Sequence, residues 1–197
     1  MLEKKYVIID FIFHPSRAIA TLKDTSPFLL VILTAINMFL FGFNWSVSHF
    51  VINFQASLFW LVVLYLGVLA ILNLVAFLGV YYVLARVGKE HVHLESIKIL
   101  AYDYNLALFV CNVIEVAIVL LLYFDQQYWL SVIIYDAAHV ALMLWIAIFG
   151  SRAVQLVENQ SELRSSIKVW IATFVMFVVS TVFYLVEGAS LISNIVR

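Results

Sequence analysis

Charged residues and cysteine are scarce in this chain, and each shortage excludes a class of protein. Only 12% of the 197 residues are charged and 65% are hydrophobic, and a soluble domain of this length cannot cover so much apolar surface. Basic and acidic residues nearly balance, at 11 and 12, so nucleic acid is not an expected partner. The one cysteine, Cys111, excludes an internal disulfide and a cysteine-rich metal site. The mean hydropathy of +1.08 indicates an integral membrane protein.

Five apolar stretches are long enough to cross a bilayer, which takes roughly 20 residues. The predicted fold is an all-α integral membrane protein with five transmembrane helices, at about residues 28–45, 57–85, 99–124, 128–150 and 169–187. Ser26 and Pro27 predict the start of the first helix, as a capping residue followed by proline at the first helical position. Gly88 predicts the end of the second. The chain is thus divided into an N-terminal segment, 1–25, and a five-span bundle, 26–197.

The N-terminal segment has an amphipathic pattern in residues too few to span a membrane. Ala18, Ile19 and Leu22 share one helical face, whereas Arg17 and Lys23 point elsewhere. This pattern is typical of a segment lying in the membrane interface, with basic side chains at the lipid headgroups. The alternative is a cytoplasmic cap whose apolar face packs on the bundle.

Basic residues decide the predicted orientation. They precede span one or lie between spans two and three and between spans four and five, and the opposite side carries only Arg197. By the positive-inside rule the N-terminus is cytoplasmic and the C-terminus external. Tyr81, Tyr82 and Trp170 would then belong to the aromatic belt of the cytoplasmic interface.

Two short stretches accompany this layout. Phe13–Ala18 (FHPSRA) and Leu22–Asp24 (LKD) precede the proline of span one, and Ile99–Tyr102 (ILAY) opens span three. In these stretches and in its topology the chain resembles the Yip1-domain family of small five-span membrane proteins, although no proline follows Tyr102 as it does in many members. The long hydrophilic N-terminal region of the eukaryotic trafficking members is missing. The resemblance therefore implies a compact prokaryotic member, in a bacterial inner membrane, rather than one with a Rab-type partner.

No complete catalytic motif accompanies the topology. The sequence has no His-Glu-x-x-His, no Gly-x-Ser-x-Gly and no phosphate-binding glycine loop. The first functional hypothesis is a non-enzymatic protein that acts through contacts with membrane lipids or other membrane proteins. The second is a small transporter or channel for a metal ion or proton, for which five spans imply a homo-oligomer. A membrane metalloenzyme is the third.

Polar residues lie at matching depth in the third and fourth spans. Glu115 is nine residues before the end of its span and Asp136 eight after the start of the next, so both lie roughly 12–14 Å below one surface. An ionisable residue at that depth costs about 3 kcal/mol on insertion scales. Each has a polar neighbour on the same helical face, which gives the set Asn112, Glu115, Asp136 and His139.

This set allows three interpretations. Two carboxylates, an imidazole and an amide oxygen suit a divalent metal, either zinc, manganese or iron. A carboxyl group in the membrane interior can instead handle protons or cations. In the third interpretation the set is a polar clasp that hydrogen-bonds across the helical hairpin and fixes its register.

Other polar residues are secondary candidates. Asp103 lies just inside span three, on the face opposite Asn112, where it could contact Lys98, Lys168 or the N-terminal segment. The favoured interpretation is a shallow acid that water or a lysine reaches. Asn73 and Tyr184, near mid-membrane, predict helix-packing contacts. His91 and His93 follow span two and are either a loop metal pair or simply exposed.

Overall fold

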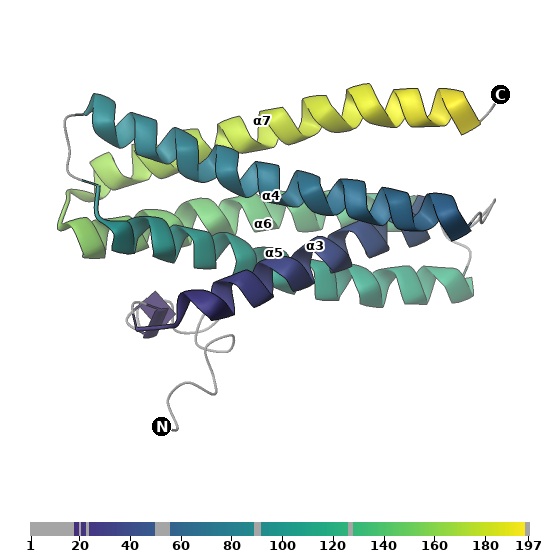
Figure 1. Cartoon of the computed structure of the whole chain (residues 1–197), viewed down its shortest axis with the longest axis horizontal. Helices are drawn as coiled ribbons and strands as arrows, with labels where there is room; N and C mark the ends of the chain where they lie inside the picture. Colours follow the sequence, from purple (N-terminus) through teal and green to yellow (C-terminus); the bar gives the residue numbers. More distant parts are fainter. Residues whose placement is uncertain are drawn as a thin grey trace.

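The chain is described here by a computed structural model, over residues 18–19, 21–22, 24–49, 56–88, 92–125 and 128–195. Within these ranges the description leaves out the side chains at 45–49, 56–59, 61–62, 66, 119–125, 128–136, 139 and 183–195. Long helices account for nearly all of it (Figure 1): α3 (Pro27–His49), α4 (Ala56–Val87), α5 (Leu94–Asp125), α6 (Tyr128–Glu158) and α7 (Glu162–Ile195).

Each of these helices contains one predicted span. All five are long and apolar enough to cross a membrane, and the described residues form no strand, so the all-α class with five membrane-length helices is confirmed. Three helices continue past the predicted spans at one end of the bundle: α5 begins at Leu94, α6 ends at Glu158 and α7 begins at Glu162. No glycine or proline interrupts these extensions, so the polar residues in them remain helical.

The predicted helix ends at Ser26 and Gly88 are confirmed. The backbone N–H of Phe28 donates to Ser26 Oγ at 3.3 Å, and that of Leu29 donates to the Ser26 carbonyl oxygen at 3.0 Å. At the end of α4 the N–H of Gly88 donates to the Leu84 carbonyl oxygen at 3.0 Å. Ser26 therefore caps α3, and Gly88 follows the last helical residue of α4.

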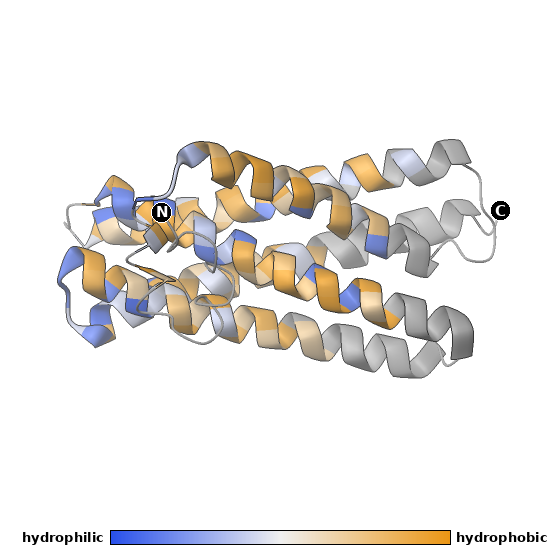
Figure 2. Ribbon diagram, turned by 90° about the horizontal axis from the view of Figure 1, so that it is seen from below, coloured by the Kyte–Doolittle hydropathy of each residue, from blue (hydrophilic) through white to orange (hydrophobic). Residues whose placement is uncertain are grey.

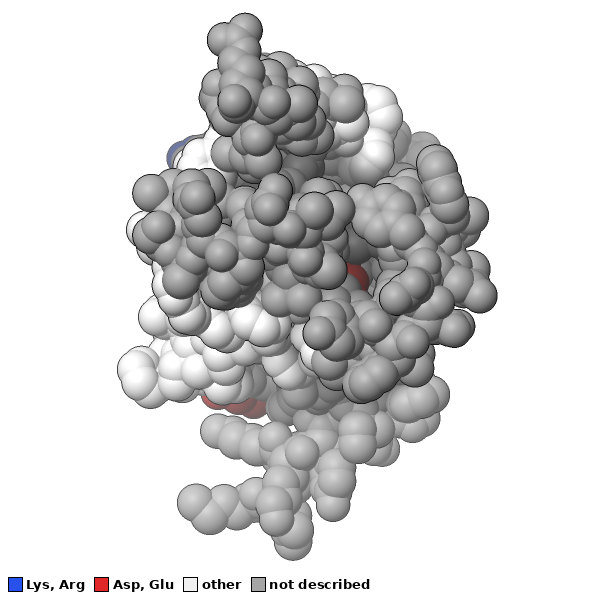
Figure 3. Space-filling model, turned by 90° about the vertical axis from the view of Figure 1, so that its right-hand side faces the viewer, with Lys and Arg blue, Asp and Glu red and all other residues white. Residues whose placement is uncertain are grey.

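Successive helices run in opposite directions, so α3, α5 and α7 point one way and α4 and α6 the other (Figure 1). The start of α3 and the α4–α5 and α6–α7 connections lie together at one end, where hydrophilic residues gather (Figure 2). Seen from the other end, the visible described surface carries few charged side chains (Figure 3). The connections that the sequence analysis grouped as cytoplasmic thus share one end of the bundle.

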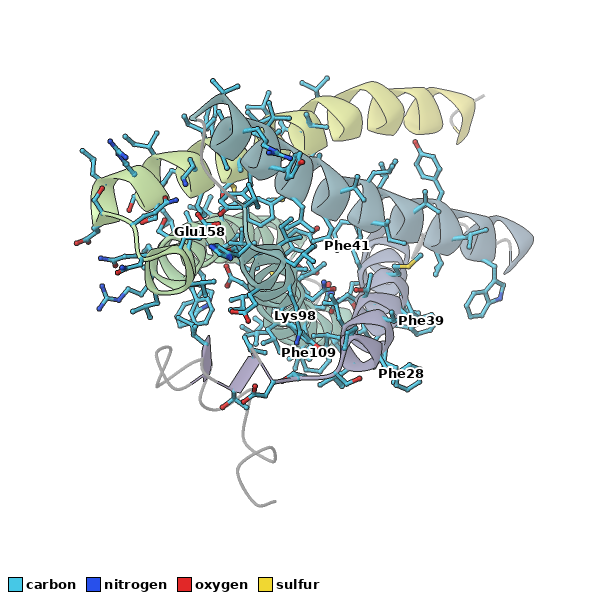
Figure 4. All side chains as sticks on the ribbon, turned by 60° about the vertical axis from the view of Figure 1, so that its left-hand side comes forward. Phe28, Phe39, Phe41, Lys98, Phe109 and Glu158 are labelled. Atoms are coloured by element: carbon cyan, nitrogen blue, oxygen red, sulfur yellow. The ribbon has the colours of Figure 1, made fainter. Side chains whose placement is uncertain are left out.

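Helix α5 lies at the centre. Of its apolar span, 72% of residues are buried, against 22–39% for the spans of the other four helices. Every residue from Ile99 to Leu108 is buried, whichever direction its side chain takes. Each outer helix has one face toward the bundle and one away from it, as α3 shows. Phe28 and Phe39 point away from the bundle, whereas Phe41 is only 6% exposed and points into it (Figure 4).

The N-terminal segment contributes to this core. Ala18, Ile19 and Leu22 are at most 2% exposed and belong to the same apolar cluster as residues of α5, α6 and α7. Their shared face is covered by protein, as the alternative of a cap packed on the bundle predicts, rather than left open to lipid. The Tyr102 hydroxyl donates to the Ser26 carbonyl oxygen at 2.6 Å and ties the start of α3 to α5. The rest of the segment, including Phe13–Arg17, lies outside the described residues.

One close approach requires a glycine. A Cβ atom built on Gly42 of α3 would lie 2.8 Å from Val63 Cα and 2.9 Å from the Val63 carbonyl carbon in α4. These are backbone atoms, which cannot turn aside as a flexible side chain can. The absence of a side chain at Gly42 therefore sets the spacing between α3 and α4.

Candidate functional site: a polar interior around helix α5

Two asparagines of α3 and two of α5 form a buried ladder between these helices. Asn37 Nδ2 donates to the Asn105 carbonyl oxygen at 2.6 Å and to Asn105 Oδ1 at 3.2 Å. Seven residues further along each helix, Asn44 Nδ2 donates to the Asn112 carbonyl oxygen at 2.9 Å. A weaker contact, from Asn112 Nδ2 to Asn37 Oδ1 at 3.5 Å, joins the two steps.

The spacing of this asparagine ladder follows from helix geometry. Asn37 and Asn44 are seven residues apart, as are Asn105 and Asn112. Side chains seven apart share a face, and parallel helices that pack with a small left-handed twist bring such positions together repeatedly. The ladder was not predicted, although the Asn-x6-Asn spacing in both spans was the available signal. Polar side chains at such positions are known to fix which helices pair and in which register.

Glu115 extends the asparagine ladder. Glu115 is only 3% exposed. Asn44 Nδ2 lies 3.5 Å from Glu115 Oε2, and Cys111 Sγ lies 3.3 Å from Glu115 Oε1. The prediction that Glu115 and Asn112 are buried on one face is confirmed, and the described partners of that face lie on α3 and on α5 itself. The side chains of Asp136 and His139 lie outside the description, so their approach to Glu115 remains a prediction.

Asp103 differs from its predicted setting. It is 0% exposed, and neither carboxyl oxygen has a hydrogen-bond partner among the described residues. Asp103 is therefore buried rather than shallow, and the expected contact with Lys168 is not observed, because Lys168 donates to Gln160 Oε1 at 2.6 Å and lies 3.6 Å from Glu158 Oε2. The start of α5 at Leu94 explains the burial, since it places Asp103 more than two turns inside the helix.

A second polar group, around Glu158 at the end of α6, was not predicted. Tyr81 Oη donates to Glu158 Oε1 at 2.7 Å, and Gln160 Nε2 donates to Glu158 Oε2 at 2.8 Å. Lys168 completes the group, with Nζ 5.8 Å from the centroid of the Tyr81 ring. Tyr81 is 0% exposed, so it is not part of a lipid-facing aromatic belt, whereas Tyr82 and Trp170 are exposed as expected.

The remaining candidates either have no described hydrogen bond to these groups or lie outside the described residues. Asn73 is half-buried in α4, and His93 is exposed just before α5. His91 and the Tyr184 side chain lie outside the described residues. Within the described part of the chain, no three His, Cys, Asp or Glu side chains are grouped in a way that could hold a metal ion.

Comparisons with protein-family models, with curated proteins and with solved structures found no match to this chain. The residues themselves therefore carry the functional argument.

The asparagine ladder yields a first prediction. Replacing Asn37 with Leu should lower the free energy of unfolding by about 1–3 kcal/mol, because it leaves Asn105 Oδ1 and Asn112 Nδ2 buried without their partner. The double variant with Asn37→Leu and Asn105→Leu should lose less free energy of unfolding than the two single variants lose together. Thermal unfolding in detergent measures all three.

The control pairs Asn37→Leu with Thr173→Val. Thr173 is buried in α7, and its hydroxyl donates to the Val169 carbonyl oxygen of its own helix at 2.8 Å. Because the two positions share no partner, their effects should add. If the Asn37 and Asn105 changes also add, the two side chains do not interact and the asparagine ladder does not hold α3 on α5.

Proposed function

We propose that the chain is a non-enzymatic, Yip1-like protein of the bacterial inner membrane that acts through lateral contacts with lipids or other membrane proteins, including further copies of itself. Its N-terminus lies in the cytoplasm and its C-terminus outside. The observation that carries the proposal is the outward face of α4, where Leu64, Val68, Leu72 and Val75 are each between 46% and 67% exposed. These residues recur every three or four positions and form one apolar stripe along the helix.

The arrangement of polar groups supports the same proposal. In a membrane, side chains that hydrogen-bond inside the bundle hold helices together, and those that face outward meet lipid or a partner. In the asparagine ladder and in the Glu158 group, the polar atoms face the interior of the bundle and hydrogen-bond to members of the same group. The apolar stripe on α4 is part of the outward surface, together with exposed apolar side chains of α3, α6 and α7.

A second candidate function rests on Asn112 and Glu115. The Asn112 Oδ1 atom is buried without a hydrogen-bond partner among the described residues, close in sequence to the Glu115 carboxyl. An unused oxygen beside an acid is a feature of cation sites, so transport of a proton or a divalent metal past Asn112, Glu115, Asp136 and His139 is the alternative. Zinc, manganese or iron would be the metal.

Photo-crosslinking tests the outward face. A photoreactive residue at Val68 should give lipid or membrane-protein adducts in intact membranes, because 46% of Val68 is exposed on the stripe. The matched control is the adjacent Leu69, which is 7% exposed and should react within its own chain. Internal adducts from both positions would contradict the proposed surface.

Flux measurements separate the two functions. Liposomes that contain the purified protein should pass protons and divalent metals no faster than protein-free liposomes. A flux that disappears in Glu115→Gln would overturn the proposal in favour of the transport alternative.

A further inference from the structure

Two buried polar side chains on one face of α5 have no hydrogen-bond partner among the described residues. They are Ser96, through Oγ, and Asp103, through both carboxyl oxygens. Ser96 is 1% exposed and Asp103 is 0% exposed. Seven residues separate them, so they share a helical face and lie roughly 10 Å apart along the axis. Groups of this kind are the places where proteins hold a water, an ion or a proton.

The Asp103 carboxyl lies where three helices meet. A Cβ atom built on Gly150 of α6 would lie 3.0 Å from Asp103 Oδ2, 2.9 Å from Leu100 Cδ2 and 3.1 Å from Val169 Cγ1 of α7. The glycine thus lets the carboxyl approach the backbone of α6 among apolar side chains. An ionised carboxylate is strongly disfavoured there, since among the described residues no hydrogen-bond donor offsets the loss of water.

The charged groups on the packed helices do not neutralise Asp103. On α7, Lys168 is held by Gln160 and Glu158, and on α6 the exposed Arg152 donates to Gln155 Oε1 at 2.6 Å. The other described charged groups of the same end make no hydrogen bond to the carboxyl: Asp24, Arg86, Glu95, Lys98, Glu162 and Arg164. Arg17, Lys23, Lys89 and Glu90 lie outside the described residues. A neutral, protonated carboxyl is the form that these surroundings accept.

We propose that Asp103 is a proton-binding site inside the bundle, filled from the end at which α5 begins. A hydronium ion transfers a proton to one Asp103 oxygen and leaves as water, and the reverse step regenerates the carboxylate. Ser96 lies between Asp103 and that end, and its hydroxyl both donates and accepts hydrogen bonds. It therefore anchors the short line of water through which the proton passes. This site uses the face of α5 opposite the asparagine ladder and does not depend on the proposed function.

Infrared spectroscopy of the full chain in lipid tests the proposal. Aspartate labelled with carbon-13 at its side-chain carboxyl identifies the bands of protonated aspartic acids. We expect one such band at neutral pH, which shifts when light water is replaced by heavy water and is lost reversibly as the pH is raised. The band should remain in Asp136→Asn and be absent from Asp103→Asn. The Asp136 variant keeps the assignment secure even where Asp103→Asn folds poorly.

The other outcomes overturn the proposal. Absence of the band at neutral pH means that Asp103 is ionised. A band that never shifts in heavy water means a sealed acid that exchanges no proton. Loss of the band on adding sodium or potassium chloride at constant pH means that a metal cation, rather than a proton, occupies the site.

A second variant tests the route. Ser96→Ala should slow the heavy-water shift of the Asp103 band several-fold without changing the pH at which the band is lost, since the hydroxyl lies on the path and not at the site. Ser151→Ala is the control, because the Ser151 hydroxyl donates to the Ala147 carbonyl oxygen within α6 and is not unpaired. Equal exchange rates in the two variants would exclude Ser96 from the route.

Discussion

Replacing Gly42 with Ala should destabilise the bundle by about 1–3 kcal/mol, and replacement with Leu should cost more. An added Cβ atom would meet the Val63 backbone, including Cα at 2.8 Å, so α3 and α4 must separate to admit it. Separation also loosens the packing that holds Asn37 and Asn44 against α5. Thermal unfolding in detergent measures the change.

Gly79 of α4 is the matched control for Gly42. A Cβ atom built there meets nothing within 4 Å, and the residue lies inside a helix. Gly79→Ala should therefore leave stability unchanged or raise it by up to about 1 kcal/mol, the helix preference of alanine over glycine. If both variants behave alike, α3 and α4 are not in the close contact described here.

Replacing Lys168 with Met should cost about 3 kcal/mol or more. The side chains of Lys168 and Glu158 are only 8% and 2% exposed, so the change leaves a buried carboxylate without its cation. Adding Glu158→Gln to Lys168→Met should recover part of the loss, because the uncompensated charge is then gone. Unfolding midpoints of the two single variants and the double variant measure this recovery.

Arg164 gives the control for the Lys168 prediction. It lies one turn earlier in α7 and is exposed, so Arg164→Met should change stability little. A double variant at Glu158 and Lys168 that is less stable than either single one would contradict the account, since it would mean that each residue acts through partners other than the ion pair.

The elements of this fold could be predicted because they depend on local patterns. Apolar length gave the five spans, and the capping chemistry of Ser26 and Gly88 gave two helix ends that the hydrogen bonds confirm. The burial of Asn112 and Glu115 followed from their depth in an apolar run. Each of these predictions depends on one helix and its surroundings, and not on which other helix packs against it.

The partners could not be predicted, because they depend on how whole helices pair. Matching depth predicts that Glu115 faces the next helix, which stays a prediction, but it gave no sign of the contact to Asn44, which joins helices that are not neighbours in sequence. Asp103 was expected near water because its distance from the helix end was judged from the apolar run, whereas α5 begins earlier. The apolar face of Ala18 and Leu22 has the same pattern whether it meets lipid or protein, so only the packed structure distinguishes the two.

The central place of α5 has a consequence for how the chain is made. Synthesis runs from the N-terminus, so α3 is made before α5. The hydrogen-bond partners of the α5 asparagines, Asn37 and Asn44, are therefore already available when α5 is made. The opposite face has no such cover at that moment, because Gly150 and Val169 follow later in the chain. In a chain that inserts as it is made, Asp103 would therefore lie on an uncovered face of α5 until α6 and α7 pack on it. Truncation before α6 should leave Asp103 accessible to modification while the contact between α3 and α5 has already formed.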